Sequence, residues 1–432
     1  MIVRGTTHLV QHTSHEHGAV LVTGYGAVSP FGHGVDRLWE ALTAGRSGVR
    51  RLQQDGPLWA EVPVRIGAPA ALNTDATLGR VRANRLDRSQ QLALVAADEA
   101  WADAGSPDVD GDRLAVVVGT GVGGIETLLD AHDVLGMKGA RRVSPRTVPM
   151  LMANAAAAQI SIERGARAGA YTTVSACASG AEAIAIGARL IVTGEADVVI
   201  AGGTEAAVTP VAMAAFAQSQ ALARPGADEA PETLSRPFDR DRRGFVLGEG
   251  AGIVVLERAD HAAARHQRSR GTLAGWGITS DAHHITAPLD DGRQQARAMT
   301  VAIRMAGLTG TDIDHVDAHA TGTLTGDTAE ALAIRRAVGT HPVVTAPKSA
   351  IGHMFGAAGA VEAIVTLRTL ETDTVPPTRN LDQLDPTIDL DVVAGTARNV
   401  PLRAALNNSF GFGGQNASLV FTATTKTGEH AA

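Results

Sequence analysis

Cysteine is almost absent from this sequence, since Cys177 is the only one among 432 residues. A single cysteine excludes an internal disulfide framework and any metal site built from several thiolates. Chains with unpaired thiols are typical of reducing compartments, so we expect a cytoplasmic protein. Cys177 is therefore a lone thiol, and its neighbourhood decides whether it is a packing residue or a nucleophile.

Long apolar runs and an excess of positive charge are also absent. No segment reaches the roughly 18 consecutive apolar residues of a membrane-spanning helix, and the first residues lack the charged-then-apolar pattern of a signal peptide. Charged residues make up 19% of the chain and the formal net charge is −7, which argues against a broad positive surface for nucleic acid. We expect neither a membrane nor a nucleic-acid partner.

The elements that are present follow an α/β pattern, and 44% apolar residues can supply the cores of two domain-sized units. Strand-like runs rich in Val and Ile alternate with Ala-rich helical stretches. In the first half, strands are expected at 20–23, 114–118, 172–174 and 197–201, and helices at 38–44, from 154 and at 181–192. In the second half, strands are expected near 273 and at 315–317, 343–346 and 418–422, and helices at 294–306, from 327 and at 356–370.

The order of elements starts again after a polar stretch at 261–270, which predicts two similar α/β halves. Loops at the strand ends of two such halves would meet in one crevice, where α/β folds usually bind ligands. The predicted division is a flexible extension over 1–18, an amino-terminal half over 19–267 that holds the cysteine, a carboxy-terminal half over 268–425, and a tail over 426–432.

Cys177 lies in the stretch Ser-Ala-Cys-Ala-Ser-Gly (175–180), between an expected strand and an expected helix. The amino end of a helix offers unpaired N–H groups and the positive end of the helix dipole, which should lower the pKa of the thiol. The small neighbours would let a carbonyl group approach the sulfur. This position favours a nucleophile over a buried packing residue.

Two further stretches place imidazoles at strand-to-helix passages. His319 follows a predicted strand in Asp-Ala-His-Ala-Thr-Gly-Thr (317–323), and His353 ends the stretch Pro-Lys-Ser-Ala-Ile-Gly-His (347–353). Taken alone, each histidine could equally be a satisfied structural group. Lys348 is unusual because the chain has only two other lysines, Lys138 and Lys426, among many arginines. A lysine in that background indicates a task that the planar arginine fork does not suit.

Glycine is concentrated in a fourth stretch, Asn-Asn-Ser-Phe-Gly-Phe-Gly-Gly-Gln-Asn (407–416). Its glycines allow tight turns and a close approach of the backbone to a ligand. No Gly-Lys-Ser/Thr sequence accompanies it, so a phosphate-binding loop is the weaker interpretation. We expect a backbone oxyanion donor or a mobile flap.

Together, in this order and spacing, the four stretches resemble the β-ketoacyl-acyl-carrier-protein synthases of the thiolase superfamily, in particular the elongating synthase II type. The resemblance extends from about Val20 to Phe421 and includes Ser-Arg-Pro-Phe-Asp (235–239) and Arg-Gly-Phe-Val-Leu-Gly-Glu-Gly (243–250). It implies a thiolase-like fold with α-β-α-β-α layers. It also implies an acyltransferase that condenses a Cys-bound acyl chain with a decarboxylating malonyl unit in fatty acid or polyketide elongation.

The resemblance also implies roles for individual residues. Cys177 would carry the acyl chain, His319 and His353 would complete a Cys-His-His triad, and Lys348 would be a buried cation paired with Glu362. The backbone N–H groups of Cys177 and Phe412 would form the oxyanion hole. Secondary roles are implied for Phe410 (gating), Thr321 and Thr323 (pantetheine binding), and Val122 and Phe216 (acyl pocket).

The same resemblance implies partners. An acidic acyl carrier protein would deliver the substrates on its phosphopantetheine, so the enzyme itself would need no metal and no organic cofactor. Gln220 stands where we would expect a basic docking residue. The family is dimeric, so a homodimer is expected, with a chain-length-factor-like partner as the alternative. The remaining candidates for carrier docking are Arg80, Arg82, Arg85, Arg141 and Arg142.

Three other functions fit the sequence less well. A non-elongating partner subunit would lack the nucleophile. A thiolase or a synthase III-type initiator would replace one histidine or use a second cysteine, and this chain has only one cysteine. A cysteine hydrolase would need one histidine and would leave Lys348 unexplained. The sequence leaves open whether the enzyme serves primary fatty acid synthesis or acts as the catalytic subunit of a type II polyketide synthase.

Overall fold

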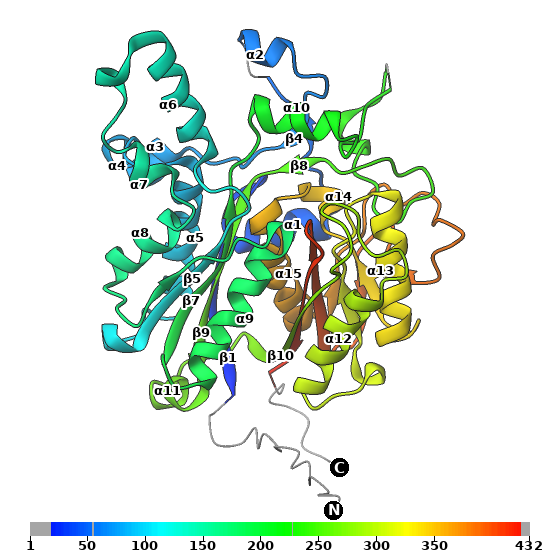
Figure 1. Ribbon diagram of the computed structural model, residues 1–432. Helices are drawn as coiled ribbons and strands as arrows, with labels where there is room; N and C mark the ends of the chain where they lie inside the picture. Colours follow the sequence, from blue (N-terminus) through cyan, green and yellow to red (C-terminus); the bar gives the residue numbers. More distant parts are fainter. Residues whose placement is uncertain (1–18, 54–55, 227, 425–432) are drawn as a thin grey trace, which may run out of the picture.

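The computed structural model describes residues 19–53, 56–226 and 228–424, and it is built around one hydrogen-bonded sheet of 12 strands (Figure 1). The predicted extension 1–18 and tail 426–432 lie outside the described residues. Along the sheet the strands run β14-β12-β11-β16-β17-β10-β1-β9-β7-β5-β6, with β2 beside β1. Their bounds are β1 Val20–Ser29, β2 Gly32–His33, β5 Leu114–Gly119, β6 Ala170–Tyr171, β7 Val198–Glu205, β9 Gly250–Arg258, β10 Gly271–Ser280, β11 His315–Asp317, β12 Val343–Thr345, β14 Asp391–Val392, β16 Ala404–Gly411 and β17 Gln415–Thr422.

Each end of the sheet combines parallel and antiparallel strands in the same way. In the first part, β5 pairs parallel with β6 and β7, and β9 runs antiparallel between β7 and β1. In the second part, β11 pairs parallel with β12 and β16, and β17 runs antiparallel between β16 and β10. The two parts join where β1 pairs antiparallel with β10. The chain therefore repeats one half-sheet twice, as the thiolase-like fold requires.

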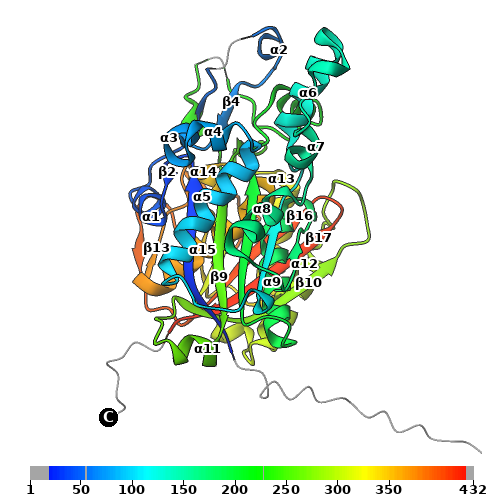
Figure 2. The same ribbon diagram turned by 90° about the vertical axis from the view of Figure 1, so that its left-hand side faces the viewer.

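Helices form three layers around the two half-sheets (Figures 1 and 2). The helices α9 (Ser179–Val192) and α15 (Ala358–Thr372) lie in the middle and share a core with strands of both half-sheets. The first half-sheet is covered outside by α5 (Arg88–Asp103) and α8 (Ala155–Arg164), and the second by α12 (Arg293–Met305) and α13 (Leu324–Ala337). The predicted α-β-α-β-α arrangement is confirmed.

The central helices pack closely because their first turns contain glycine. A Cβ atom at Gly180 would come within 2.7 Å of the carbonyl oxygen of Gly356, and one at Gly359 would come within 2.9 Å of the Cβ of Ala181. Contacts below about 3 Å are forbidden to real Cβ atoms. Glycine therefore lets the beginnings of α9 and α15 lie against one another.

Two sequence expectations about local structure were wrong. Residues 172–174 form no strand; Thr173 instead donates from its hydroxyl to the carbonyl of Ser179, and the N–H of Ser175 donates to the hydroxyl of Ser179. These side-chain bonds replace ladder bonds. The helices α6 (Ile125–Lys138) and α7 (Thr147–Leu151) were missed before the helix at 154, since neither has a buried face.

Residues 265–270 connect α11 (Ala259–Ala264) to β10 in the middle of the chain. The division into halves at residue 267 stays a prediction. Within the described ranges, no helix combines the length and the apolar character that a bilayer crossing requires.

Candidate active site

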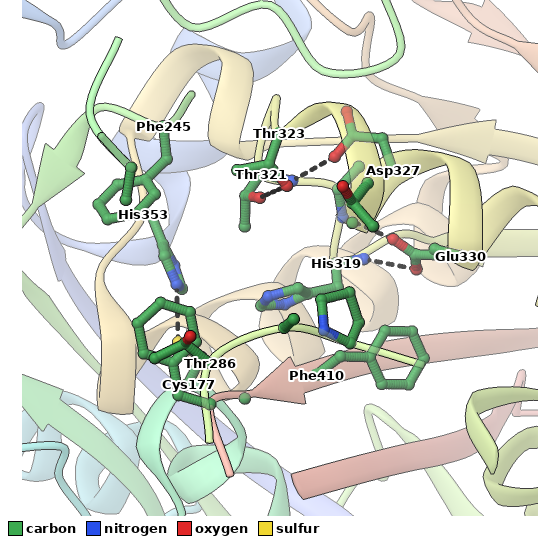
Figure 3. Close-up of a pocket in the computed structure, with 18 of the residues that line it drawn as sticks. Cys177, Phe245, Thr286, His319, Thr321, Thr323, Asp327, Glu330, His353 and Phe410 are labelled. Atoms are coloured by element: carbon green, nitrogen blue, oxygen red, sulfur yellow. Dashed lines mark hydrogen bonds between the residues drawn. The ribbon is translucent and has the colours of Figure 1, made fainter. Parts of the chain in front are cut away.

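A cavity of about 540 Å³ opens where loops from both half-sheets meet, and Cys177, His319 and His353 line it (Figure 3). His319 follows β11, His353 follows β12, Phe410 lies near the end of β16, and Phe412 belongs to the turn between β16 and β17. The three strands β11, β12 and β16 are parallel, so their carboxyl ends share one edge of the sheet. The topology therefore gathers segments that are far apart in the sequence, as expected for an α/β crevice.

Cys177 is presented by a short 3-10 turn, Ala176–Ala178, that leads directly into α9. Ala176 has φ 51, a left-handed conformation that costs energy for a residue with a Cβ atom. The strained residue turns the chain sharply just before the sulfur. The side chain of Cys177 is 5% exposed, so the sulfur faces the cavity rather than bulk water.

The sulfur and both imidazoles converge in the cavity. Nε2 of His353 lies 2.9 Å from Sγ of Cys177, and the nearest ligand atoms of Cys177, His319 and His353 all lie within 4.8 Å of one another. The two imidazole rings are 5.3 Å apart at 85°. Two ligands of a tetrahedral zinc ion would be separated by about 3.5 Å, so the 2.9 Å contact fits a hydrogen bond better than shared metal ligation.

The pKa of the Cys177 thiol runs against the sequence-based expectation. Burial raises the pKa of Cys177 to about 12, although Lys348 and the backbone N–H groups of Phe412 and Cys177 act to lower it. The expected lowering by the helix terminus was wrong because removal of water from the sulfur outweighs the dipole. In the free protein the sulfur is a neutral thiol, so attack on a substrate requires a proton acceptor.

The imidazoles of His353 and His319 are held in the uncharged form. Burial, and then the positive charge of Lys348, hold the pKa of both imidazoles well below the usual value of about 6.5. A neutral imidazole can accept a proton at one nitrogen and donate a hydrogen bond from the other. The pair can therefore take the thiol proton and stabilise a developing oxyanion.

Lys348 lies behind the imidazoles as a fully buried cation. Its side chain is 1% exposed, and its Nζ lies 2.5 Å from Oε1 of the 0% exposed Glu362. Burial raises the pKa of Glu362 to about 7, and burial together with Glu362 raises the pKa of Asp317 well above its usual value. The Lys348 ammonium therefore pairs with Glu362, and its charge also acts on the carboxyl group of Asp317.

The glycine-rich stretch forms the tip of a β-hairpin rather than an irregular loop. β16 ends at Gly411 and β17 begins at Gln415, and Gly413 and Gly414 adopt φ 78 and φ 71 in the turn. A Cβ atom at Gly411 would come within 3.0 Å of the backbone nitrogen of Cys177. The hairpin therefore brings the N–H group of Phe412 beside that of Cys177, and both N–H groups face the sulfur. The ring of Phe410 is 9% exposed and lies 5.9 Å from that of His319.

Two buried carboxyl groups that the sequence analysis did not identify hold the loop around His319 (Figure 3). Glu330 accepts hydrogen bonds from the N–H groups of His319 and Ala320 at 2.8 and 2.7 Å. Asp327 accepts from the N–H groups of Thr321 and Gly322 at 3.0 and 3.1 Å. Their three-residue spacing at the start of α13 is the signal that could have identified them, since it places both on one face of the helix.

Thr321 and Thr323, the predicted pantetheine-binding residues, line the cavity with their hydroxyl oxygens 3.1 Å apart. Val122 and Phe216, the predicted acyl-pocket residues, do not line it: Val122 is 53% exposed and Phe216 lies behind Phe355. Their role stays a prediction.

The predicted docking arginines lie apart from the cavity. Arg80, Arg82 and Arg85 border a separate depression, and Arg141 and Arg142 are exposed on a short 3-10 turn. Instead, Arg243 is the only arginine or lysine among the described residues that line the cavity. It is 42% exposed and forms an ion pair with Glu229. The sequence does not reveal Arg243 as a cavity residue. Its place near Gln220 depends on backbone hydrogen bonds of Phe245 with Ala221 and Ala223.

Comparisons with known proteins agree over nearly the whole chain. The β-ketoacyl synthase amino-terminal domain matches residues 18–262 and the carboxy-terminal domain matches residues 270–382. A 3-oxoacyl-[acyl-carrier-protein] synthase 2 of Mycobacterium bovis is 46% identical over 403 residues, covering 93% of this chain and 96% of the relative.

Solved structures are similar in fold. The complex AntDE:AntF, a type II polyketide synthase acyl-carrier protein with its ketosynthase bound to the hexaketide, matches with a TM-score of 0.87 and 28% identity over 95% of this chain and 100% of the other. The ishigamide ketosynthase/chain length factor matches with a TM-score of 0.87 and 32% identity over 94% and 100%.

Proposed function

The chain belongs to the β-ketoacyl synthase family, and on that basis we propose that it condenses an acyl chain held on Cys177 with a malonyl unit held on an acyl carrier protein. It is an acyltransferase of the 3-oxoacyl-[acyl-carrier-protein] synthase type. The observation that supports the role of this site is the 2.9 Å contact between Cys177 and His353, with His319 in the same cavity. Because the phosphopantetheine arrives on the carrier, the enzyme binds no organic cofactor of its own.

The first half-reaction loads the acyl chain. The sulfur of Cys177 attacks the thioester carbonyl while its proton passes to His353, and the N–H groups of Cys177 and Phe412 meet the oxyanion. The pantetheine sulfur then leaves and takes the proton from His353. The neutral state of His353, caused by burial and Lys348, is what allows this imidazole to accept the proton.

The second half-reaction forms the carbon–carbon bond. The malonyl carboxylate leaves as carbon dioxide, and its bonding electron pair forms an enolate whose oxygen accepts hydrogen bonds from His319 and His353. The enolate carbon attacks the acyl carbonyl, and the thiolate of Cys177 leaves and regains a proton from solvent. Donors that are fixed before the charge develops contribute most to such a step, and the Glu330 contact to the backbone of His319 supplies that fixation.

The test of this function uses the full chain with purified carrier proteins. Incubation with acyl carrier protein is expected to add the acyl mass to the peptide that contains Cys177. Subsequent addition of malonyl carrier protein should release carbon dioxide and the 3-oxoacyl product. An adduct on another peptide, or elongation without an adduct, would refute the assignment.

Fatty-acyl elongation is the favoured pathway, because the identity to the mycobacterial synthase 2 is 46%, against 28% and 32% for the two polyketide ketosynthase structures. The catalytic subunit of a type II polyketide synthase is the second candidate, since those structures share the fold at TM-scores of 0.87. A comparison of saturated acyl with poly-β-keto acyl substrates on the carrier distinguishes the two.

A second copy of the chain is the proposed partner at the open end of the sheet. The edge strand β6 is exposed there, and α6, which stands beyond the strands in Figure 2, has no buried residue. The helices α6 and α8 and the strand β6 carry apolar side chains that are more than 40% exposed, namely Leu128, Leu135, Met137, Ile162 and Tyr171. Apolar patches beside an open strand edge mark protein interfaces.

Light scattering of the chain purified alone is expected to give twice the mass of one chain. A monomer at micromolar concentration would contradict the homodimer. If the chain alone is a monomer and its mass doubles only when a chain-length-factor-like subunit is added, the heterodimer is favoured over the homodimer.

Arg243 is the proposed contact for the carrier at the cavity mouth. We expect Arg243→Gln to lower kcat/KM for malonyl carrier protein about fivefold, because an exposed ion pair contributes up to about 1 kcal/mol. The rate with malonyl N-acetylcysteamine, which has no phosphate and no protein, should not change. Arg240→Gln is the matched control, since Arg240 is 53% exposed but does not line the cavity. An equal loss with both substrates would contradict the carrier contact.

A further inference from the structure

Gln295 is a buried glutamine whose side chain the fold does not use. It lies in the first turn of α12 and is 3% exposed. Its Oε1 is buried without a hydrogen-bond partner, and its carboxamide forms no hydrogen bond with any residue of the described ranges. Buried polar groups are almost always hydrogen-bonded, because the loss of water without a replacement partner costs free energy. The mechanism above does not use Gln295, so its free carboxamide points to a partner outside the chain.

The side chain belongs to the wall of the active-site cavity. Gln295 lines this cavity together with Asp281 and Asn416, which are also buried. Those two side chains satisfy one another, since Nδ2 of Asn416 donates to Oδ1 of Asp281 at 2.7 Å. The other oxygen of Asp281 accepts from the N–H of Leu289 at 3.0 Å. Gln295, by contrast, remains free to bind a ligand in the cavity.

Close packing of α12 fixes the position of Gln295. A Cβ atom at Gly277 in β10 would come within 2.0 Å of the carbonyl oxygen of Ala298. One at Gly292, the N-cap residue of α12, would come within 2.2 Å of the carbonyl oxygen of Ala329 in α13. Glycine therefore lets the first turns of α12 lie directly against the sheet and against α13. A side chain on such a rigid element is preorganised, so a ligand loses little free energy in ordering it.

The cavity has an exposed mouth and a buried inner end. Its lining includes the exposed Thr286 and Leu324 as well as the buried Cys177 and His353. In the proposed function the carrier is a protein that stays outside, whereas its thioester must reach the sulfur of Cys177. The pantetheine arm therefore occupies the passage between the mouth and the sulfur, and the wall that contains Gln295 borders this passage.

We infer that Oε1 of Gln295 accepts a hydrogen bond from an amide N–H of the pantetheine arm, and that this contact selects thioesters that carry the amide. The inference rests on the proposed function and adds a specificity-determining residue to it. An amide oxygen that faces the cavity requires a donor. The arm offers donors in its two secondary amides and in a hydroxyl group at its phosphate end, and the amides lie nearer the thioester.

Other parts of the substrates cannot satisfy this oxygen. The thioester oxygen, the malonyl carboxylate and the phosphate only accept hydrogen bonds, and an alkyl chain neither accepts nor donates. A site built to bind a donor rejects an analogue that lacks it, because the buried acceptor is then left unpaired. Replacement of one N–H group in the substrate therefore tests the contact directly.

The experiment measures elongation by the full chain after Cys177 has been loaded from acyl carrier protein. The extender is malonyl-pantetheine, or one of two analogues in which an ester oxygen replaces one amide N–H. With one of the analogues, the wild-type KM is expected to rise about tenfold, the value of one hydrogen bond in a dry site. Its kcat should not change, because the contact is equal in the bound ground state and in the transition state.

Gln295→Met removes the carboxamide and keeps a side chain of similar length. Its KM for malonyl-pantetheine should be about tenfold higher than that of the wild type, and it should no longer distinguish the amide from the ester. A purely structural role of Gln295 would affect all three extenders alike and leave the wild-type preference in the variant. If Gln295→Met folds poorly, the wild-type comparison of the three extenders still decides the question.

Gln294→Met is the matched control. Oε1 of Gln294 is also buried without a partner, but Gln294 does not line the cavity, so its loss should leave every KM unchanged. Equal wild-type KM values for malonyl-pantetheine and both analogues, or an unchanged KM in Gln295→Met, would overturn the inference. No elongation of the loaded chain by any malonyl thioester would instead refute the proposed function.

Discussion

Replacement of Cys177 by alanine is expected to abolish acyl loading and condensation, with a loss of at least about 1000-fold in kcat/KM. No other cysteine exists in the chain to take over the covalent step. The fold should survive, because alanine fills nearly the same buried space beside Ala178 at the start of α9. Intact-mass measurement after incubation with acyl carrier protein and a product assay with malonyl carrier protein check the result.

Cys177→Gln separates the two half-reactions. The amide cannot form a thioester, so condensation should be lost, whereas His319 and His353 remain in place to stabilise the enolate. Malonyl decarboxylation is therefore expected to persist, measured as release of labelled carbon dioxide. Residual elongation by the Cys177→Ala variant, or intact elongation by the Cys177→Gln variant, would show that the covalent step occurs at another residue.

Lys348→Met is expected to produce the largest loss of stability. Removal of one partner from a buried ion pair typically costs about 3–5 kcal/mol, since the other charge stays unpaired in a dry site. Glu362, whose pKa is already about 7, would then have an even higher pKa. An unfolded glutamate has a pKa of about 4.3, and folding raises this value for Glu362. The folded state therefore binds the proton more tightly than the unfolded state. The free energy of unfolding falls as pH rises from the unfolded pKa through the folded pKa.

The loss of unfolding free energy in Lys348→Met should therefore be larger at pH 8 than at pH 5, measured by urea denaturation at both values. The double variant Lys348→Met/Glu362→Gln should recover part of the loss at pH 8, because the remaining side chain carries no charge. An equal loss at both pH values, or no recovery in the double variant, would contradict the buried pair as the cause.

The same substitution should change the pH dependence of chemistry. Lys348 is the second cause, after burial, that holds the pKa of His319 and His353 below the usual value. In the Cys177→Gln background, decarboxylation should stay constant from pH 8 to pH 6, because both imidazoles remain neutral. Addition of Lys348→Met removes the positive charge that lowers the pKa of both imidazoles. The fall of the decarboxylation rate on the acid side of the pH profile should then begin at higher pH. A purely structural role of Lys348 would lower the rate without shifting this fall.

Much of the architecture follows from short sequence patterns. Apolar strands followed by Ala-rich helices determine the α/β order, and each chemistry-bearing residue lies at a strand-to-helix passage. That pattern predicts that the loops carrying Cys177, His319 and His353 meet in one crevice. The scarcity of lysine likewise identified Lys348, whose burial explains why a flexible point charge stands there in place of arginine.

Other features depend on packing that a linear pattern does not contain. The thiol pKa was misjudged because the dipole of α9 is visible in the sequence, whereas the burial of the sulfur is not. Arg243 and Phe355 belong to segments brought beside the cavity by the pairing of Phe245 with Ala221 and by the stacking on Phe216. Val122 and Phe216, placed by resemblance alone, lie outside the cavity of the single chain.

The glycine contact between the first turns of α9 and α15 has a consequence for how this enzyme can change. The helix behind the nucleophile and the helix behind its proton acceptor meet at backbone-to-backbone distance, with Gly180 against the carbonyl of Gly356. A methyl group there would push sulfur and imidazole apart at once, so selection can hardly adjust the reacting pair gradually. Substrate preference is instead open to change at the side chains that line the cavity, because their substitution leaves the two helical ends in place.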